Sequence, residues 1–161
     1  MAREQHDRED LLADAKSLVE RVRLEIPGHD EPVIVGFRQD GGASFYFGAQ
    51  PAYHFTSAGK LRRAYSDEFL YKAERGQLVE MRRDRSPGTV NLLRHVLDAN
   101  EQRAFIGRTR QQLQALRAAL AEGKFKVSGQ VPADMNLADR VERWLDEFAD
   151  GFEIADRPNT C

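Results

Sequence analysis

Cysteine is almost absent from the sequence. The one cysteine, Cys161, is the last of 161 residues, so no internal disulfide can form. The fold must therefore be held by a buried core, which a chain of this length is long enough to build. We expect the thiol to sit on a flexible end, where nothing preorganises it as a nucleophile.

Long apolar runs are also missing. No segment approaches the ~18 consecutive apolar residues of a membrane span, and the opening MAREQHDRED has no apolar stretch of a secretion signal. These absences favour a cytoplasmic protein without membrane contact. Hydrophobic residues make up 41% and charged residues 31% of the chain, with nine Phe, which indicates one folded domain over residues 1–161.

The sequence patterns of known catalytic and metal sites are not found. The four histidines lie far apart without the spacing of zinc ligands, so neither a metal nor a cofactor is predicted: His6, His29, His54 and His95. The glycine-rich run GFRQDGG (36–42) lacks the lysine and hydroxyl of a phosphate-binding loop, and no G-x-S-x-G motif occurs. This favours a non-enzymatic protein, although catalytic sites built from distant residues leave no local pattern.

The first regular element predicted is an amphipathic helix over residues 7–26. Its apolar positions recur at steps of three and four, and acidic residues crowd its first turn. Pro27 and Gly28 would end it. The apolar positions are Leu11, Ala15, Leu18, Val22 and Ile26.

Residues 32–97 change to a two-residue period and predict an antiparallel sheet. Six apolar-alternating runs are joined by connections too short for parallel crossovers, which indicates a meander. The run at 89–97 fits either a seventh strand or the start of a helix. We favour the strand, because Asp98 and Glu101 resemble a capping box that would start the helix there.

Residues 98–151 predict a helical C-terminal part, with a tail at 152–161. The segment KFKVSGQVP (124–132) fits either a short strand or a loop. One predicted helix face carries Phe105, Thr109, Leu113, Leu116 and Leu120, and a second carries Leu137, Val141, Trp144, Leu145 and Phe148.

The predicted fold class is α+β, an antiparallel meander of six to seven strands packed by the N-terminal helix and two C-terminal helices. A small barrel capped by a helix, as in pleckstrin-like folds, is the alternative on topology alone.

Charge is distributed unevenly along the chain. Residues 60–85 carry eight Lys/Arg against five Asp/Glu, whereas residues 1–31 carry five against nine and residues 123–161 five against eight. This pattern excludes a generally basic polyanion binder and leaves room for a local basic patch.

Strand alternation predicts that one sheet face is apolar and the other basic and aromatic. The expected apolar face holds Val33, Val35, Phe37, Phe45, Phe47, Tyr53, Phe55, Leu61, Tyr65, Phe69, Tyr71, Val79 and Met81. The expected opposite face holds Arg38, Tyr46, His54, Lys60, Arg62, Lys72, Glu74, Glu80 and Arg82.

Cations interleaved with aromatic rings can contact an anionic ligand or a nucleic acid. An ordinary solvated face with cross-strand ion pairs, or burial against a partner, explains the same pattern. The candidate binding residues are Arg38, Tyr46, His54, Arg62, Arg63, Lys72 and Arg82.

Arg63 departs from the pattern, since alternation places it with Leu61 and Tyr65 on the apolar side. A charge there must be paired, reach the sheet edge or line a cavity. The rival hypothesis is therefore a ligand-binding protein or enzyme with a pocket between sheet and helices, using Arg63, Tyr65 and either His54 or His95.

Trp144 has two interpretations as well. Its helix stripe is most simply core, and otherwise an interface for a protein partner or for self-association, as in a structural subunit of an oligomer. The sequence thus favours a binding or interaction module whose ligand it does not identify.

Overall fold

The computed structural model describes residues 18–48, 51–66, 69–83, 92–128 and 137–156. Within these ranges the chain forms a nine-stranded antiparallel sheet and two helices, broadly an α+β arrangement. The strands are β1 (Leu18–Glu25), β2 (Val33–Arg38), β3 (Ala43–Phe47), β4 (Ala52–Phe55), β5 (Leu61–Tyr65), β6 (Phe69–Glu74), β7 (Gln77–Arg83), β8 (Leu92–Val96) and β9 (Lys126–Ser128). The helices are α2 (Ala99–Ala121) and α3 (Leu137–Phe148).

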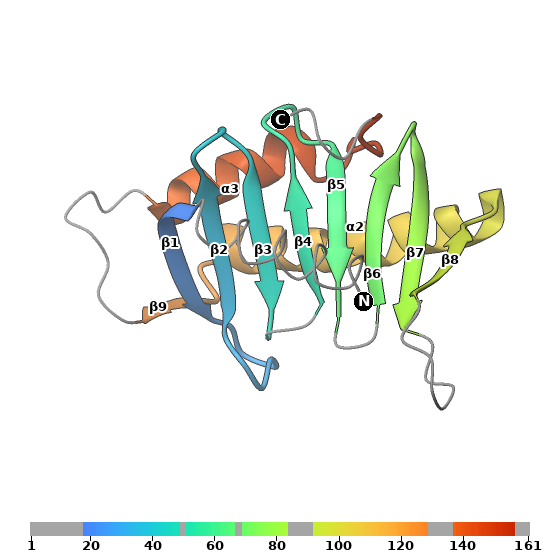
Figure 1. Cartoon of the computed structure of the whole chain (residues 1–161). Coiled ribbons are helices and arrows are strands. Elements are labelled where there is room, and N and C mark those ends of the chain that lie inside the picture. The colour runs from blue at the N-terminus through green and yellow to red at the C-terminus, as the bar shows by residue number, and fades with distance from the viewer. Residues whose placement is uncertain (1–17, 49–50, 67–68, 84–91, 129–136, 157–161) are drawn as a thin grey trace.

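The strands follow a meander. Their order across the sheet is β8-β7-β6-β5-β4-β3-β2-β1-β9, so every neighbour except β9 is also a neighbour in sequence (Figure 1). Among the described residues β8 and β9 are the two edges, and the sheet is open. The meander is confirmed, and the strand predicted within residues 89–97 is confirmed as β8 at Leu92–Val96. The predicted count of six to seven strands is too low, and the closed small barrel is wrong.

The N-terminal helix prediction is wrong for its second half. Residues 18–25 form β1, which pairs antiparallel with β2 and places Val22 opposite Val35. Residues 7–17 lie outside the described residues. The error has a physical cause: Leu18, Val22 and Ile26 are spaced by four, and a spacing of four keeps side chains on one face of a helix and also on one face of a strand.

Helix α2 begins as the sequence predicts. Asp98 Oδ1 accepts a hydrogen bond from the Glu101 backbone N–H at 2.8 Å, and the Glu101 carboxylate accepts one from the Asp98 N–H at 3.0 Å. This capping box satisfies two donors that the first turn would otherwise leave without partners. The five residues expected on its apolar face are the five that are buried in the helix.

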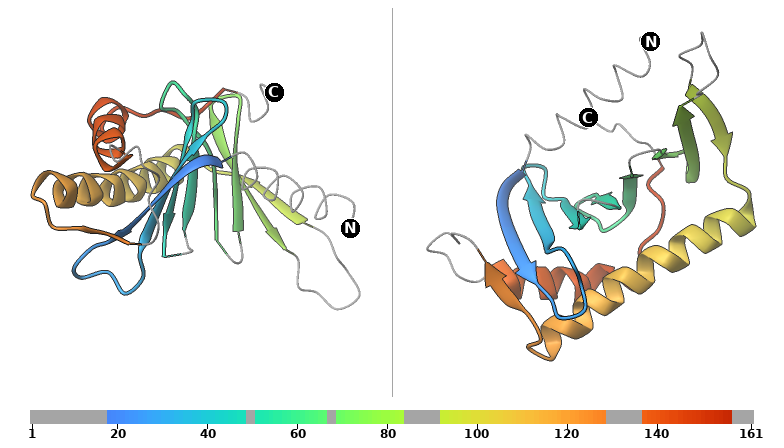
Figure 2. Two further views of the ribbon diagram at one scale, coloured as in Figure 1. Left: turned by 90° about the vertical axis from the view of Figure 1, so that its left-hand side faces the viewer. Right: turned by 90° about the horizontal axis from the view of Figure 1, so that it is seen from below.

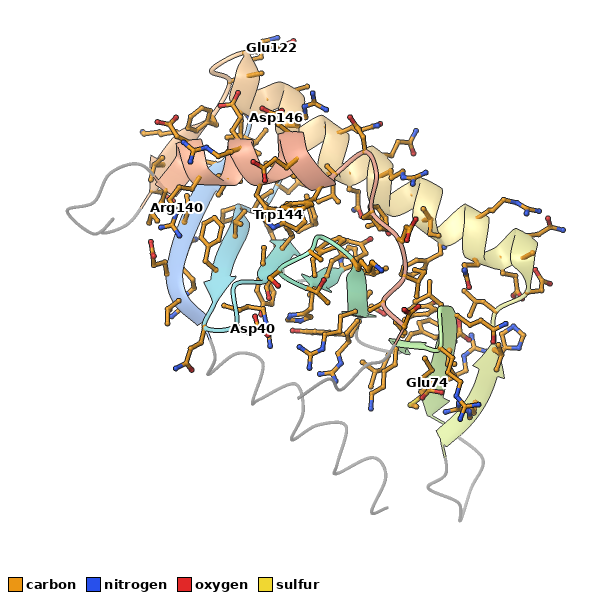
Figure 3. The ribbon with its side chains drawn as sticks, turned by 90° about the horizontal axis from the view of Figure 1, so that it is seen from above. Asp40, Glu74, Glu122, Arg140, Trp144 and Asp146 are labelled. Atoms are coloured by element: carbon orange, nitrogen blue, oxygen red, sulfur yellow. The ribbon has the colours of Figure 1, made fainter. Side chains whose placement is uncertain are left out.

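Both helices lie on the same face of the sheet (Figures 1 and 2). Trp144 of α3 reaches the sheet between Phe45 and Phe55, with its ring centroid 5.1 Å from each of theirs, and is 7% exposed (Figure 3). The structure therefore places Trp144 in the core between α3 and the sheet, in agreement with the simpler of its two interpretations.

The chain after α3 returns to the middle of the sheet. Ile154 forms a parallel bridge with Leu61, where the Leu61 N–H donates to the Glu153 carbonyl at 2.7 Å and the Ala155 N–H donates to the Leu61 carbonyl at 2.8 Å. Phe152, Ile154 and Ala155 are buried. The first residues of the predicted tail are therefore packed against the sheet, and residues 157–161 lie outside the described residues.

Neither helix in the described residues has the length and apolar character needed to cross a membrane.

Candidate functional site

A register irregularity decides which way Arg63 points. His54 of β4 pairs with Arg63 of β5, but the next residue, Phe55, pairs with Leu61, so Arg62 is an extra residue on β5. One extra residue reverses the alternation beyond it. Arg63 therefore lies with His54 on the face of the sheet opposite α2 and α3. We call this the helix-free face, because neither of the two described helices lies on it. The predicted place of Arg63 on the apolar side beside Leu61 is wrong.

Four polar side chains consequently form a line across the helix-free face. Register pairs connect Ser44 of β3 to His54, His54 to Arg63, and Arg63 to Lys72 of β6. Neighbouring strands are about 4.8 Å apart, so consecutive side chains in this line are in reach of one another. All four are buried. We call Ser44, His54, Arg63 and Lys72 the polar row.

His54 contacts side chains of β2, β3 and β5. Its Nδ1 lies 2.7 Å from the Ser44 hydroxyl and 3.4 Å from Arg38 Nη1. Since a guanidinium carries only donors, Nδ1 acts as the acceptor in the Arg38 contact. The His54 ring stacks on Tyr65 with centroids 5.4 Å apart and meets Tyr46 edge-on at 5.9 Å. Tyr65 is thus on the helix-free face, and its predicted place on the apolar face is wrong.

Two of the predicted cations are engaged at the end of β2 by one acid. Asp40, in the turn between β2 and β3, lies 3.6 Å from Arg38 Nε and 3.5 Å from Arg62 Nη1. The same carboxylate accepts the Gly42 N–H at 2.8 Å, which holds it in the turn. This single carboxylate therefore offsets part of the positive charge of the two arginines at this corner.

Arg82 is not on this face. It pairs across the ladder with Phe69 and holds its guanidinium 4.7 Å above that ring, on the side of the sheet that α2 covers. The cause is the two-residue turn Arg75-Gly76, in which both residues have positive φ. That turn pairs odd-numbered residues of β6 with even-numbered residues of β7.

The same turn also places the other residues of β7 on the face opposite to the one predicted. Glu80 faces the helices beside Tyr71, whereas Val79 pairs with Lys72 and Met81 with Leu70 on the helix-free face. The predicted faces were right for β6 and inverted for β7. The signal that could have found this is the dipeptide Arg-Gly between two strands, because a two-residue hairpin turn commonly takes Gly in its second position.

The residues of the rival pocket do not come together. Arg63, Tyr65 and His54 lie on the helix-free face, whereas His95 lies on β8, exposed, with Nε2 3.0 Å from a Glu101 carboxylate oxygen. A pocket between the sheet and the helices around Arg63 is therefore wrong. Within the described ranges, no three His, Cys, Asp or Glu side chains gather in a way that could hold a metal ion.

A third polar group lies under α2 and was not anticipated. Tyr71 donates its hydroxyl to Glu80 Oε2 at 3.0 Å and packs its ring on Phe105 of α2 at 4.7 Å. Burial and the Glu80 carboxylate raise the pKa of Tyr71 to about 12. Its hydroxyl therefore stays protonated in neutral solution.

Comparisons with protein-family models, with curated proteins and with solved structures find no match to this chain.

Proposed function

We propose that the protein is a binding module whose polar row receives carboxylate groups of an acidic polypeptide. The observation that carries this proposal is the pairing of Arg63 with Lys72. Like charges directly opposite one another on a sheet are destabilising. Both side chains are also buried, with 3% and 8% exposed, so two cations are concentrated within one part of this face. A carboxylate of a bound polypeptide would add a charge-assisted hydrogen bond to each of them.

The neighbours of the pair support a carboxylate as the group bound. Ser44 and His54 continue the same line and supply hydrogen-bonding groups beside the two cations. Charged hydrogen bonds from arginine and lysine to a carboxylate are among the strongest in proteins. Tyr46 and Tyr65 flank the row and provide apolar ring surface for the stem of an acidic side chain.

Burial of the aromatic rings disfavours the stacking of nucleic-acid bases on this face. A surface that stacks bases must present the faces of its aromatic rings to solvent. Here His54 is 1% exposed, and its ring is covered on one side by Tyr65. Arg38 and Arg62, which a phosphate backbone would need, are engaged by Asp40. Nucleic acid binding is accordingly an outcome that the experiment must exclude.

The test compares R63A and K72A with R82A in isothermal titration calorimetry. R82A removes an exposed arginine from the helix side of the sheet and is the matched control. The probes are a poly-glutamate peptide, a single-stranded oligonucleotide of equal length and inorganic phosphate. We expect poly-glutamate to bind, R63A and K72A each to weaken it by about tenfold or more, and R82A to leave it unchanged.

Folding must be measured alongside binding. R63M and K72M keep the length of the side-chain stem without its charge, and thermal unfolding shows whether they remain folded. The proposal is wrong if folded R63M binds poly-glutamate as the wild type does, or if only the oligonucleotide binds and R82A weakens it equally.

A further inference from the structure

A cavity of about 820 Å³ lies on the opposite side of the sheet from the polar row, between α2 and the ends of β3 and β4. This volume falls in the range of small-molecule sites. Its walls come from three separate parts of the chain: the turn between β1 and β2, the strand ends, and α2. None of its lining residues belongs to the polar row.

The floor of the cavity is aromatic. Phe47 and Tyr53 both line it, with ring centroids 5.9 Å apart in an edge-to-face arrangement. They are 8% and 4% exposed, and Tyr53 also meets Phe105 of α2 edge-on at 6.4 Å. Rings fixed on several sides offer a rigid apolar surface, which suits a flat apolar group.

The α2 wall presents hydrogen-bond donors. Tyr53 donates its hydroxyl to Gln112 Oε1 at 2.5 Å, so the Gln112 amide is oriented and its NH₂ group remains a donor. Burial raises the pKa of Tyr53 and keeps that hydroxyl protonated. Arg108 lines the cavity four residues before Gln112, on the same side of the helix. An amide donor and a guanidinium one turn apart suit a carboxylate.

The wall from the β1–β2 turn carries the opposite charge. Asp30 and Glu31 line the cavity, and both residues are exposed. Glu31 folds over Gly48, where a Cβ would lie 2.9 Å from its carboxylate oxygen Oε2. Gly48 thus gives this carboxylate room at the rim. Two acids facing the cavity suit an ammonium group.

We propose that this cavity binds a small zwitterion with an aromatic body, of the class of free aromatic amino acids. In this arrangement the ring lies on Phe47 and Tyr53, the carboxylate meets Arg108 and Gln112, and the ammonium meets Asp30 and Glu31. The proposal is independent of acidic peptide binding at the polar row.

Four probes separate these contributions, each titrated into the full chain and followed by amide chemical shifts in NMR. L-phenylalanine carries both charges and a ring, hydrocinnamic acid lacks the ammonium, phenethylamine lacks the carboxylate, and L-alanine lacks the ring. We expect L-phenylalanine to shift the signals of the cavity residues and to bind about two- to fivefold more tightly than either single-charge analogue, the range of a partly exposed ion pair. L-alanine should not bind measurably.

Single-residue variants test which wall of the cavity contacts each charged group of the ligand. R108A should weaken L-phenylalanine and hydrocinnamic acid but not phenethylamine, whereas E31Q should weaken L-phenylalanine and phenethylamine but not hydrocinnamic acid. R103A removes a more N-terminal exposed arginine of α2 that does not line the cavity, and serves as the control. The inference is overturned if L-phenylalanine shifts no cavity signal, or if both single-charge analogues bind as tightly as it does in every variant.

Discussion

Arg63 lies directly opposite His54 on the helix-free face of the sheet, and it does so because Arg62 is an extra residue in β5. If the pairing continued regularly from Phe55 and Leu61, Arg62 would lie opposite His54, and Arg63 would lie opposite Tyr53, which faces α2. A single residue therefore decides whether a guanidinium enters the core.

Two single-residue deletions test this relationship. Deleting Arg62 leaves Leu61 opposite Phe55 and Arg63 opposite His54 in a regular ladder, so we expect a loss of at most about 1 kcal/mol, from the Arg62–Asp40 pair. Deleting Ala64 shortens the strand equally but puts Arg63 where buried Ala64 stood, and should cost roughly 3–5 kcal/mol. Urea unfolding measures both; equal losses would contradict the register.

Trp144 should be the largest single contributor of α3 to stability. Its ring contacts Phe45, Phe55 and Phe148 at centroid distances of 5.1 to 5.2 Å, so truncation leaves a cavity among aromatic rings. We expect W144A to lower the free energy of unfolding by about 3–5 kcal/mol. The exposed neighbour variant R143A should change it by less than about 0.5 kcal/mol. A small effect of W144A in urea unfolding would argue against this packing.

Glycine is required at position 59 both by the packing of Phe148 and by the backbone conformation. It has φ +82°, and a Cβ there would lie 2.3 Å from the Phe148 ring, whereas at Gly76, with φ +76°, the nearest atom to such a Cβ is Asp156 Oδ1 at 3.6 Å. G76A should cost about 1–2 kcal/mol of backbone strain. G59A should cost roughly 1–3 kcal/mol more, from overpacking against α3. Thermal unfolding of the two variants compares them, and similar midpoints would place Phe148 elsewhere.

The Tyr71 hydroxyl should make stability depend on alkaline pH. Its pKa is raised from 10.0 to about 12 in the folded protein, so the folded state holds this proton more tightly than the unfolded state. The resulting stabilisation is complete below about pH 10 and is lost as pH rises towards about 12. Y71F should remove this part of the alkaline decline, measured by urea unfolding at a series of pH values. The burial of Tyr53 contributes in the same direction, so Y53F provides the comparison.

Local patterns predicted the elements well where one period alone fitted the residues. Strands β2 to β7 alternate over short runs bounded by turns, and six such strands were predicted within residues 32–97. Helix α2 is marked by a capping box and a five-residue apolar face, and its start after Asp98 was predicted. Strand β1 was missed because a spacing of four fits helix and strand alike. The segment around Ile154 was missed because its backbone partner is Leu61, far away in sequence.

The sheet faces were harder to predict than the strands. Alternation fixes faces within a strand, but the relation between neighbouring strands depends on each turn and each extra residue. Arg62 and the Arg75-Gly76 turn each reversed the faces of the strand residues that follow them, and so moved Arg63 and Arg82 to the opposite faces from those predicted. The cavity beside Tyr53 left no trace in the sequence, because its walls come from segments that only the fold brings together.

The bridge between Ile154 and Leu61 also bears on how the chain matures during synthesis. On a ribosome the meander emerges strand by strand, and each hairpin can form soon after it leaves the exit tunnel. The backbone N–H and carbonyl of Leu61, however, form their hydrogen bonds to Glu153 and Ala155 only after residues 153–155 are translated. Completion of the central strand is therefore a late event, and a nascent chain stalled before this segment exposes an unfinished edge to chaperones.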